Sequence, residues 1–294
     1  MNEASRREPT TRRGEDLRIE VPGLTLAARR WGTPGGRPFL ALHGWLDNAN
    51  TWNRLAPRLP ELDIVALDFA GHGHSDHRAA GVHYTSLFDI QDVVAAADAL
   101  GFETFGLLGH SMGAAVASEL TGLFPERVTE AVLVDGFVHS QGSPADANDR
   151  NRKAVEQMLR AAEKRPPVYA DLDAMTRRVT EATDQSPEAA AELVARGHAF
   201  VDGGCTWRTD PRIRFATPLR ITPRQIDDLM ARSTARCLLI VARQGDRWYR
   251  PGVERRAEHH RTLEIRELDG PHHLHLEPAH VDAVTAEVRR FLAL

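Results

Sequence analysis

Short apolar segments recur along the chain and alternate with longer amphipathic ones. The apolar runs occupy residues 38–44, 63–69, 104–110, 130–136 and 237–243. Nearly continuous apolar runs of this length are typical of strands that are covered on both faces, as in a parallel sheet. Helical periodicity follows most of them, so the order of elements predicts an α/β fold with right-handed crossovers.

Two helices and a hairpin carry clear boundary signals. The segment 86–101 has Ser86 as its predicted N-cap and ends at Gly101. Segments 17–21 and 24–32 are too close together for a crossover, so they predict an antiparallel hairpin at the sheet edge. Near the end of the chain, four apolar residues share one face of an amphipathic helix: Val281, Val284, Val288 and Phe291.

The stretch from 138 to 235 lacks a buried strand pattern but contains several helical ones. An apolar stripe with i, i+3, i+4, i+7 spacing is formed by Val155, Met158, Leu159 and Ala162. Further helix starts are indicated by Ser186-Pro187 and by a capping box over 222–225. We therefore predict a core of residues 16–137 and 236–294, with 138–235 inserted as a helical cap over the carboxyl edge of the sheet.

Composition and charge narrow the function classes. The chain has 294 residues, 42% of them hydrophobic, and a formal charge of -4, so no basic surface indicates nucleic acid or an anionic membrane. No apolar run approaches the roughly 20 residues of a membrane helix. Residues 1–15 lack the apolar stretch of a secretory signal, and we expect them to form a disordered tail. Two isolated cysteines favour a reduced, cytoplasmic location.

The pentapeptide Gly109-His110-Ser111-Met112-Gly113 carries the main chemical signal. A serine hydroxyl becomes an effective nucleophile when a base removes its proton. A sharp strand-to-helix turn makes the hydroxyl protrude, and the close backbone approach at such a turn requires glycine two residues to either side. Here an apolar strand pattern ends at the first glycine and a helix rich in small residues follows the serine.

From the hairpin to the last helix, the chain resembles the α/β-hydrolase family. Segments 43–50 and 272–275 resemble the serine hydrolase-like subgroup, and 68–76 is similar to the family's loop after the next strand. The resemblance implies an α/β-hydrolase fold, with a mostly parallel central sheet, flanking helices and an inserted cap. It also implies a serine hydrolase that cleaves a carboxylic ester or related acyl substrate through an acyl-enzyme, with no metal or organic cofactor.

In this family the triad runs nucleophile, acid, histidine along the chain. Ser111 is the predicted nucleophile. His272, between a last strand at 263–268 and the last helix, is the predicted base, with His273 as its competitor. We assign His275 to packing or to a hydrogen bond.

Two aspartates compete for the role of the acid. Asp246 follows the predicted strand 237–243 and is preferred, because its place before the histidine fits the family. Asp135, after the strand pattern at 130–136, is the alternative, and we interpret it as a cap or turn carboxylate. The acid would accept the second imidazole N–H and stabilise the imidazolium.

The resemblance also implies an oxyanion hole made by the backbone N–H groups of Met112 and Trp45. The side chains of His43, Trp45 and His110 are predicted to line the substrate pocket. A metal site is not expected, since the nearby histidines at 72, 74 and 77 have no acidic ligand set beside them.

Two alternatives to the esterase hypothesis stay open. One is a hydrolase of the same fold that cleaves an activated carbon–carbon bond. The other is a small-molecule-binding scaffold with feeble turnover. The sequence leaves open the identity of the substrate and the oligomeric state, because specificity in this fold depends on loops and cap.

Overall fold

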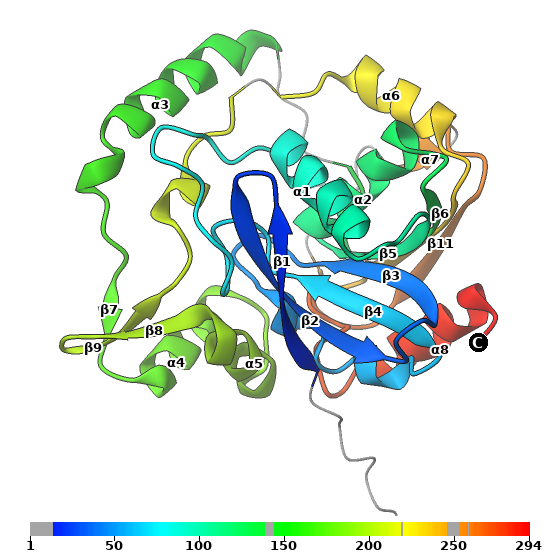
Figure 1. Ribbon diagram of the computed structural model, residues 1–294, viewed down its shortest axis with the longest axis horizontal. Coiled ribbons are helices and arrows are strands. Elements are labelled where there is room, and N and C mark those ends of the chain that lie inside the picture. Colours follow the sequence, from blue (N-terminus) through cyan, green and yellow to red (C-terminus); the bar gives the residue numbers. More distant parts are fainter. Residues whose placement is uncertain (1–13, 139–143, 219, 246–252, 258) are drawn as a thin grey trace, which may run out of the picture.

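The computed structural model describes residues 14–138, 144–218, 220–245, 253–257 and 259–294. Most of the expected tail, residues 1–13, lies outside these ranges. A central sheet has eight strands in the order β1-β2-β4-β3-β5-β6-β10-β11 (Figure 1). Its strands are β1 (Glu15–Val21), β2 (Leu24–Gly32), β3 (Arg37–Leu42), β4 (Leu62–Leu67), β5 (Phe105–His110), β6 (Val128–Val134), β10 (Arg236–Ala242) and β11 (Leu263–Leu268).

The sheet confirms the predicted α/β pattern. All five apolar runs form strands, and the pairs from β4 through β11 are parallel. The hairpin of β1 and β2 is antiparallel, and β2 joins the sheet antiparallel to β4. The first residue of β1 is Glu15, so the strand begins within the segment expected as a tail.

Helices cover both faces of the sheet, as its two-sided hydrophobicity requires. The core helices are α1 (Ser86–Ala99), α2 (Met112–Leu123), α7 (Val253–Ala257) and α8 (Val281–Leu292). Successive residues of β3 point to opposite faces: Leu40 and Leu42 belong to the cluster that includes α1 and α2, whereas Phe39 and Ala41 belong to the cluster that includes α8. The N-cap of α1 is Thr85 rather than the predicted Ser86.

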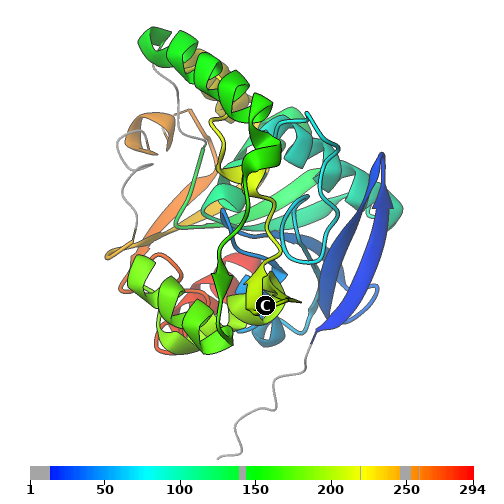
Figure 2. The same ribbon diagram turned by 90° about the vertical axis from the view of Figure 1, so that its left-hand side faces the viewer.

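The cap lies beside the carboxyl edge of the sheet, and its ends are formed by α3 and α4 (Figures 1 and 2). Its helices are α3 (Ala147–Leu159), α4 (Leu172–Ala182) and α5 (Pro187–Gly197). The last helix of the segment predicted as the cap, α6 (Pro223–Arg232), packs on the core instead, because its Ile226, Leu229 and Met230 belong to the buried cluster that contains α2 (Figure 1). The capping signals at Ser186 and Thr222 are confirmed. The predicted stripe on α3 faces outward, however, since Leu159 is 81% exposed.

The cap also contains a small antiparallel sheet that the sequence pattern did not predict. Its strands, in the order β7-β9-β8, are β7 (Val168–Tyr169), β8 (His198–Val201) and β9 (Gly204–Trp207). Strands of two to four residues with partly exposed side chains leave no apolar run to detect. Short 3-10 helices complete the chain: Ala49–Trp52, Ala56–Arg58, Pro144–Asp146, Ala161–Glu163 and Pro211–Arg214. No helix in the described ranges is both long and apolar enough to cross a membrane.

A buried ion pair joins the cap to the core. Asp68 directly follows β4. The Nε–H of Arg196, on α5, donates to both of its carboxylate oxygens, at 3.0 and 2.9 Å. The backbone N–H groups of Ala49 and His74 donate to the same carboxylate. Both partners of the ion pair are buried, so neither charge can be left alone without a large desolvation cost.

We expect Arg196→Met to destabilise the protein by about 3–5 kcal/mol, because it leaves the Asp68 carboxylate buried without its cation. The matched control is Arg232→Met, which removes an exposed pair with Asp228 and should change stability by less than about 0.5 kcal/mol. Urea unfolding of both variants measures the difference. Equal losses would show that the buried pair does not fasten the cap.

Candidate active site

Ser111 lies on a strained turn between β5 and α2. Its backbone has φ 52° and ψ -112°, a region that side chains disfavour. The two flanking glycines explain how the turn fits. A Cβ on Gly113 would lie 2.2 Å from the carbonyl oxygen of Leu42, and one on Gly109 would lie 2.6 Å from Cα of Ala114. The glycine requirement predicted for this pentapeptide therefore has a steric cause in the structure.

His272 contacts a carboxylate at the carboxyl edge of the sheet. Its Nδ1 lies 2.6 Å from Oδ2 of Asp135, the residue that directly follows β6. Asp135 is fully buried and its other oxygen accepts the N–H of Ala242 at 2.9 Å. Its backbone, like that of Ser111, has a positive φ, 42°. The carboxylate is thus fixed by β10 while it faces the imidazole.

This contact corrects the interpretation of Asp135 as a cap or turn carboxylate. The preferred acid, Asp246, lies outside the described residues. The preceding Gly245 is described, and a Cβ there would come within 2.2 Å of the Asp135 carboxylate. The absence of a side chain at Gly245 therefore makes room for Asp135. The signal in the sequence was the place of Asp135 immediately after a buried strand, the same kind of position that Ser111 occupies after β5.

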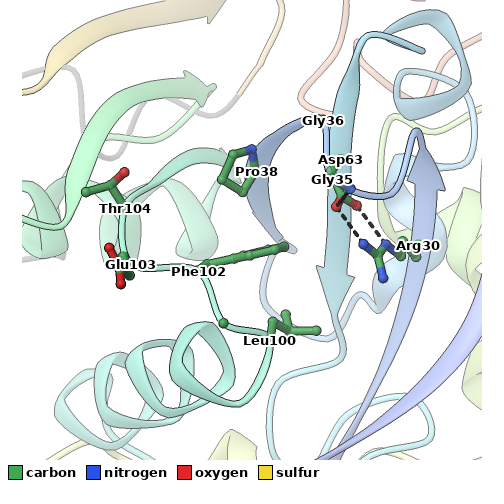
Figure 3. A pocket seen from close by; sticks show the side chains of 10 residues that line it. Arg30, Gly35, Gly36, Pro38, Asp63, Leu100, Phe102, Glu103 and Thr104 are labelled. Atoms are coloured by element: carbon green, nitrogen blue, oxygen red, sulfur yellow. Dashed lines mark hydrogen bonds and ion pairs between the residues drawn. The ribbon is translucent and has the colours of Figure 1, made fainter.

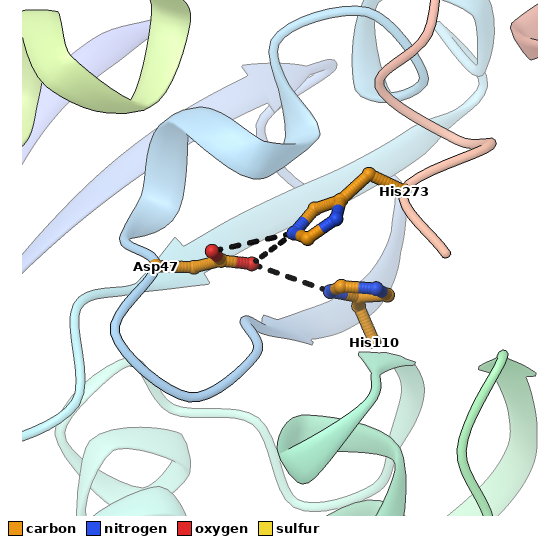
Figure 4. Close-up of side chains that lie close together, drawn as sticks. All are labelled: Asp47, His110 and His273. Carbon is orange, nitrogen blue, oxygen red and sulfur yellow. Dashed lines mark hydrogen bonds and ion pairs between the residues drawn. The ribbon is translucent and has the colours of Figure 1, made fainter. Parts of the chain in front are cut away.

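The two competing histidines have different partners. The Nε2–H of His110 donates to the backbone oxygen of His272 at 3.1 Å, and the two rings lie 4.6 Å apart. His272 is therefore held against the residue that precedes Ser111. His273 turns instead toward Asp47, with Nε2 at 3.0 Å from the carboxylate (Figure 4). The His273 ring also lies 4.5 Å from that of His110, so the feature that distinguishes His272 is the aspartate at its Nδ1.

Two buried histidines make hydrogen bonds with the backbone of the loop after β3. His43 donates from Nδ1 to the oxygen of Gly44 at 2.7 Å and accepts the N–H of Phe69 at Nε2, at 3.0 Å. His72 accepts the N–H of Leu46 at 3.4 Å. Leu46 has a φ of 66°, so the loop needs this support to keep its shape.

The structure places the three predicted pocket residues differently. Trp45 is 50% exposed, its indole N–H points to the oxygen of Ile213 at 3.4 Å, and the Arg214 guanidinium lies 5.4 Å from its ring. Trp45 thus connects the loop to the cap. His43 and His110 are buried, and ring nitrogens of both make hydrogen bonds with backbone groups. Among the histidines considered for a metal, 72 and 77 bond to separate backbone oxygens.

A pocket at the other edge of the sheet is remote from this chemistry. It is lined by the ion pair of Arg30 and Asp63 on one side and by Phe102 on the other (Figure 3). Gly36 precedes β3 and Thr104 precedes β5, so the pocket lies at the amino edge. Ser111 follows β5 and lies at the carboxyl edge.

Burial keeps the supporting histidines neutral. Desolvation lowers the pKa of His43 to about 4 and the pKa values of His72 and His110 to about 3. Burial alone would raise the pKa of Asp47, but the neighbouring His273 and His110 outweigh it and hold that pKa well below its usual range. The carboxylate is therefore charged at neutral pH while these three histidines are not.

These lowered values predict a loss of stability in mild acid. In the unfolded chain a histidine binds its proton near pH 6.5, whereas in the folded chain His43 and His72 bind theirs near pH 4 and 3. The unfolded state therefore holds more protons in this window, and stability falls as pH drops below 6.5. From pH 7 to 5 the two histidines together should lower the free energy of unfolding by about 4 kcal/mol.

Urea unfolding at both pH values tests this expectation. His72→Gln should reduce the pH-dependent drop by about 2 kcal/mol, and His259→Gln, at an exposed side chain, serves as the matched control. A stability that stays constant from pH 7 to 5 would contradict the neutral state of these rings.

Comparison with known proteins agrees with the fold. Residues 37–172 match the family model described as alpha/beta hydrolase fold. A serine hydrolase-like protein of Danio rerio is 32% identical over 96% of this chain and 89% of the relative. Lipase LipV of Mycobacterium tuberculosis is 31% identical over 63% of this chain and 67% of that protein. The crystal structure of a hypothetical protein from Pseudomonas aeruginosa has a TM-score of 0.90 and 42% identity, covering 95% of this chain and all of that one.

The strand order of the sheet and the family match thus support the same assignment. The chain belongs to the α/β-hydrolase family, in its serine hydrolase-like group.

Proposed function

We propose that this hydrolase cleaves a carboxylic ester with a triad of Ser111, His272 and Asp135. The observation that carries the proposal is the 2.6 Å contact between His272 Nδ1 and the buried Asp135 carboxylate. An aspartate in this position holds the imidazole in the tautomer whose Nε2 is free to accept a proton. The proposal replaces Asp246, the acid preferred from sequence, by Asp135.

The reaction follows from these roles. Ser111 Oγ attacks the ester carbonyl while His272 Nε2 takes its proton. The tetrahedral intermediate expels the alcohol, which receives that proton from His272, and an acyl-enzyme remains. Water then attacks the acyl carbon with His272 as base, and the acid leaves as Ser111 recovers its proton. Asp135 stays ionised and stabilises the imidazolium in both halves of the cycle.

The proposed oxyanion hole uses two backbone N–H groups. Met112 is the first residue of α2, so its N–H has no partner within the helix and points out of its N-terminus. Trp45 lies on the loop that His43 and His72 support, which would keep its N–H in place during the reaction. Fixed donors of this kind stabilise the oxyanion without reorganisation.

An ester is favoured over the other bonds for one reason. The chain is similar to a protein named as a lipase, with 31% identity over 185 residues. Cleavage of a carbon–carbon bond and ligand binding without turnover are outcomes of the tests below. No specific acyl group or alcohol is proposed.

Ser111→Ala should abolish hydrolysis of short p-nitrophenyl esters, by about a thousandfold or more, since it removes the attacking oxygen. In the unaltered protein a fluorophosphonate probe should label Ser111. Circular dichroism of the variant checks that it folds. A folded protein that neither turns over these esters nor reacts with the probe would support the binding-scaffold alternative. Probe labelling without esterase activity would favour the carbon–carbon alternative.

Asp135→Asn should lower turnover by about ten-thousandfold, because the imidazole loses both its orientation and the charge that stabilises its protonated form. The discriminating variant is Asp246→Asn, which should retain most of the activity. The matched control is Asp269→Asn. Asp269 is an exposed carboxylate that pairs with Arg243, and it lies on the same loop between β11 and α8 as His272. Steady-state kinetics with p-nitrophenyl acetate measures all three. The reverse order of losses would return the role of acid to Asp246.

A further inference from the structure

A second group of polar side chains lies behind the proposed triad. Oδ2 of Asp47 is 3.0 Å from Nε2 of His273 and 3.3 Å from Nδ1 of His110. Figure 4 shows the carboxylate pointing at both rings. All three residues are buried, and their three ligand atoms lie within 4.8 Å of one another. None of the three has a proton-transfer role in the proposed hydrolysis.

The hydrogen on His110 is placed by its other neighbour. A carbonyl oxygen can only accept, so the 3.1 Å contact with the His272 oxygen requires the hydrogen on Nε2. In the neutral ring Nδ1 then carries a bare lone pair. That nitrogen is buried and makes no aligned hydrogen bond with any described residue, although the Asp47 oxygen is near. A buried ring nitrogen without an aligned hydrogen bond and a carboxylate oxygen thus lie 3.3 Å apart.

A metal ion between the two atoms would be bound by both of them. We propose that Asp47, His110 and His273 form a binding site for a divalent transition-metal ion such as Zn²⁺. Two imidazole nitrogens and a carboxylate oxygen are a common zinc ligand set, which leaves a fourth position for water. In a tetrahedral zinc site neighbouring ligand atoms are about 3.3 Å apart, close to the two separations that Asp47 makes here.

The surroundings of the ligands also fit a metal site. Metal-binding histidines commonly donate their second ring N–H to a backbone carbonyl, which fixes the ring and its tautomer. His110 makes that bond with the His272 oxygen. Its Nδ1 needs no deprotonation to bind a metal. At His273 the ion would replace the hydrogen that Nε2 now shares with Asp47.

The site would join three segments that come from distant parts of the sequence. Asp47 lies on the same loop after β3 as Trp45, His110 precedes Ser111, and His273 follows His272. A bound ion would therefore cross-link the loop after β3, the turn at Ser111 and the loop between β11 and α8 that carries His273. The proposal concerns binding and does not depend on whether esters are hydrolysed.

Zinc binding to the metal-stripped full chain tests the proposal. Calorimetry should show one tight site per chain. X-ray absorption at the zinc edge should show two imidazole nitrogens and oxygen, at about 2.0–2.1 Å. Zinc at about 100 times its Kd should raise the melting temperature by roughly 5 °C, since a ligand that binds only the folded state stabilises it.

Variants assign the site. Asp47→Asn and His273→Gln should each weaken zinc binding at least tenfold, whereas His77→Gln, whose side chain is 47% exposed, should bind like the unaltered chain. Nitrogen NMR of the metal-free protein should find His110 singly protonated, on Nε2, with a Nδ1 signal that shifts when zinc is added. This readout uses the unaltered chain, so it holds even if the variants fold poorly.

Three results would overturn the proposal. One is the lack of a stoichiometric zinc site in the unaltered chain. Another is zinc binding that Asp47→Asn and His273→Gln leave intact while both variants stay folded, because the ion would then sit on other histidines. The last is a doubly protonated His110 ring in the metal-free protein, since a hydrogen on Nδ1 would satisfy Asp47 without a metal.

Discussion

Close packing of backbone against backbone around Ser111 is the constraint on which the rest of the site depends. The serine turn has room only because Gly109, Gly113 and Gly136 lack side chains. A Cβ on Gly136 would lie 2.4 Å from the oxygen of Ser111 itself. This crowding holds Ser111 at a positive φ that an isolated chain would avoid. The strain is thus sustained by β3, β5 and β6 together rather than by the turn alone.

Hydrogen-bond partners give chemically identical histidines different roles. His43 uses both ring nitrogens on backbone groups, and His110 uses one on the His272 carbonyl. These two rings are neutral and stabilise the loops through hydrogen bonds to the backbone. His272 instead meets a carboxylate at Nδ1 and keeps part of its surface exposed. The chemistry of each ring follows from what the adjoining strand ends present to it, not from its place in a cluster.

Much of the fold could be predicted from the sequence because it depends on local patterns. The parallel strands are continuous apolar runs, and the serine turn is marked by its glycines. The acid could not be chosen from the sequence, because Asp135 and Asp246 both follow buried strands. The structure shows that the Asp135 carboxylate contacts His272, whereas Asp246 lies outside the described residues. His272 and His273 were separable by family resemblance but not by spacing. Their partners, Asp135 and Asp47, lie more than a hundred residues away.

The misjudged parts of the cap have a different cause. Leu159 sits in a regular apolar stripe, yet it is exposed, because a stripe predicts that a face is apolar and not that something covers it. The cap strands escaped detection because they are too short to show alternation. The cap itself is no detachable insertion. If α5 were removed, the buried Asp68 carboxylate would still accept the backbone N–H groups of Ala49 and His74, but it would lose the Arg196 guanidinium. Truncation to a minimal hydrolase would therefore have to redesign position 68 first.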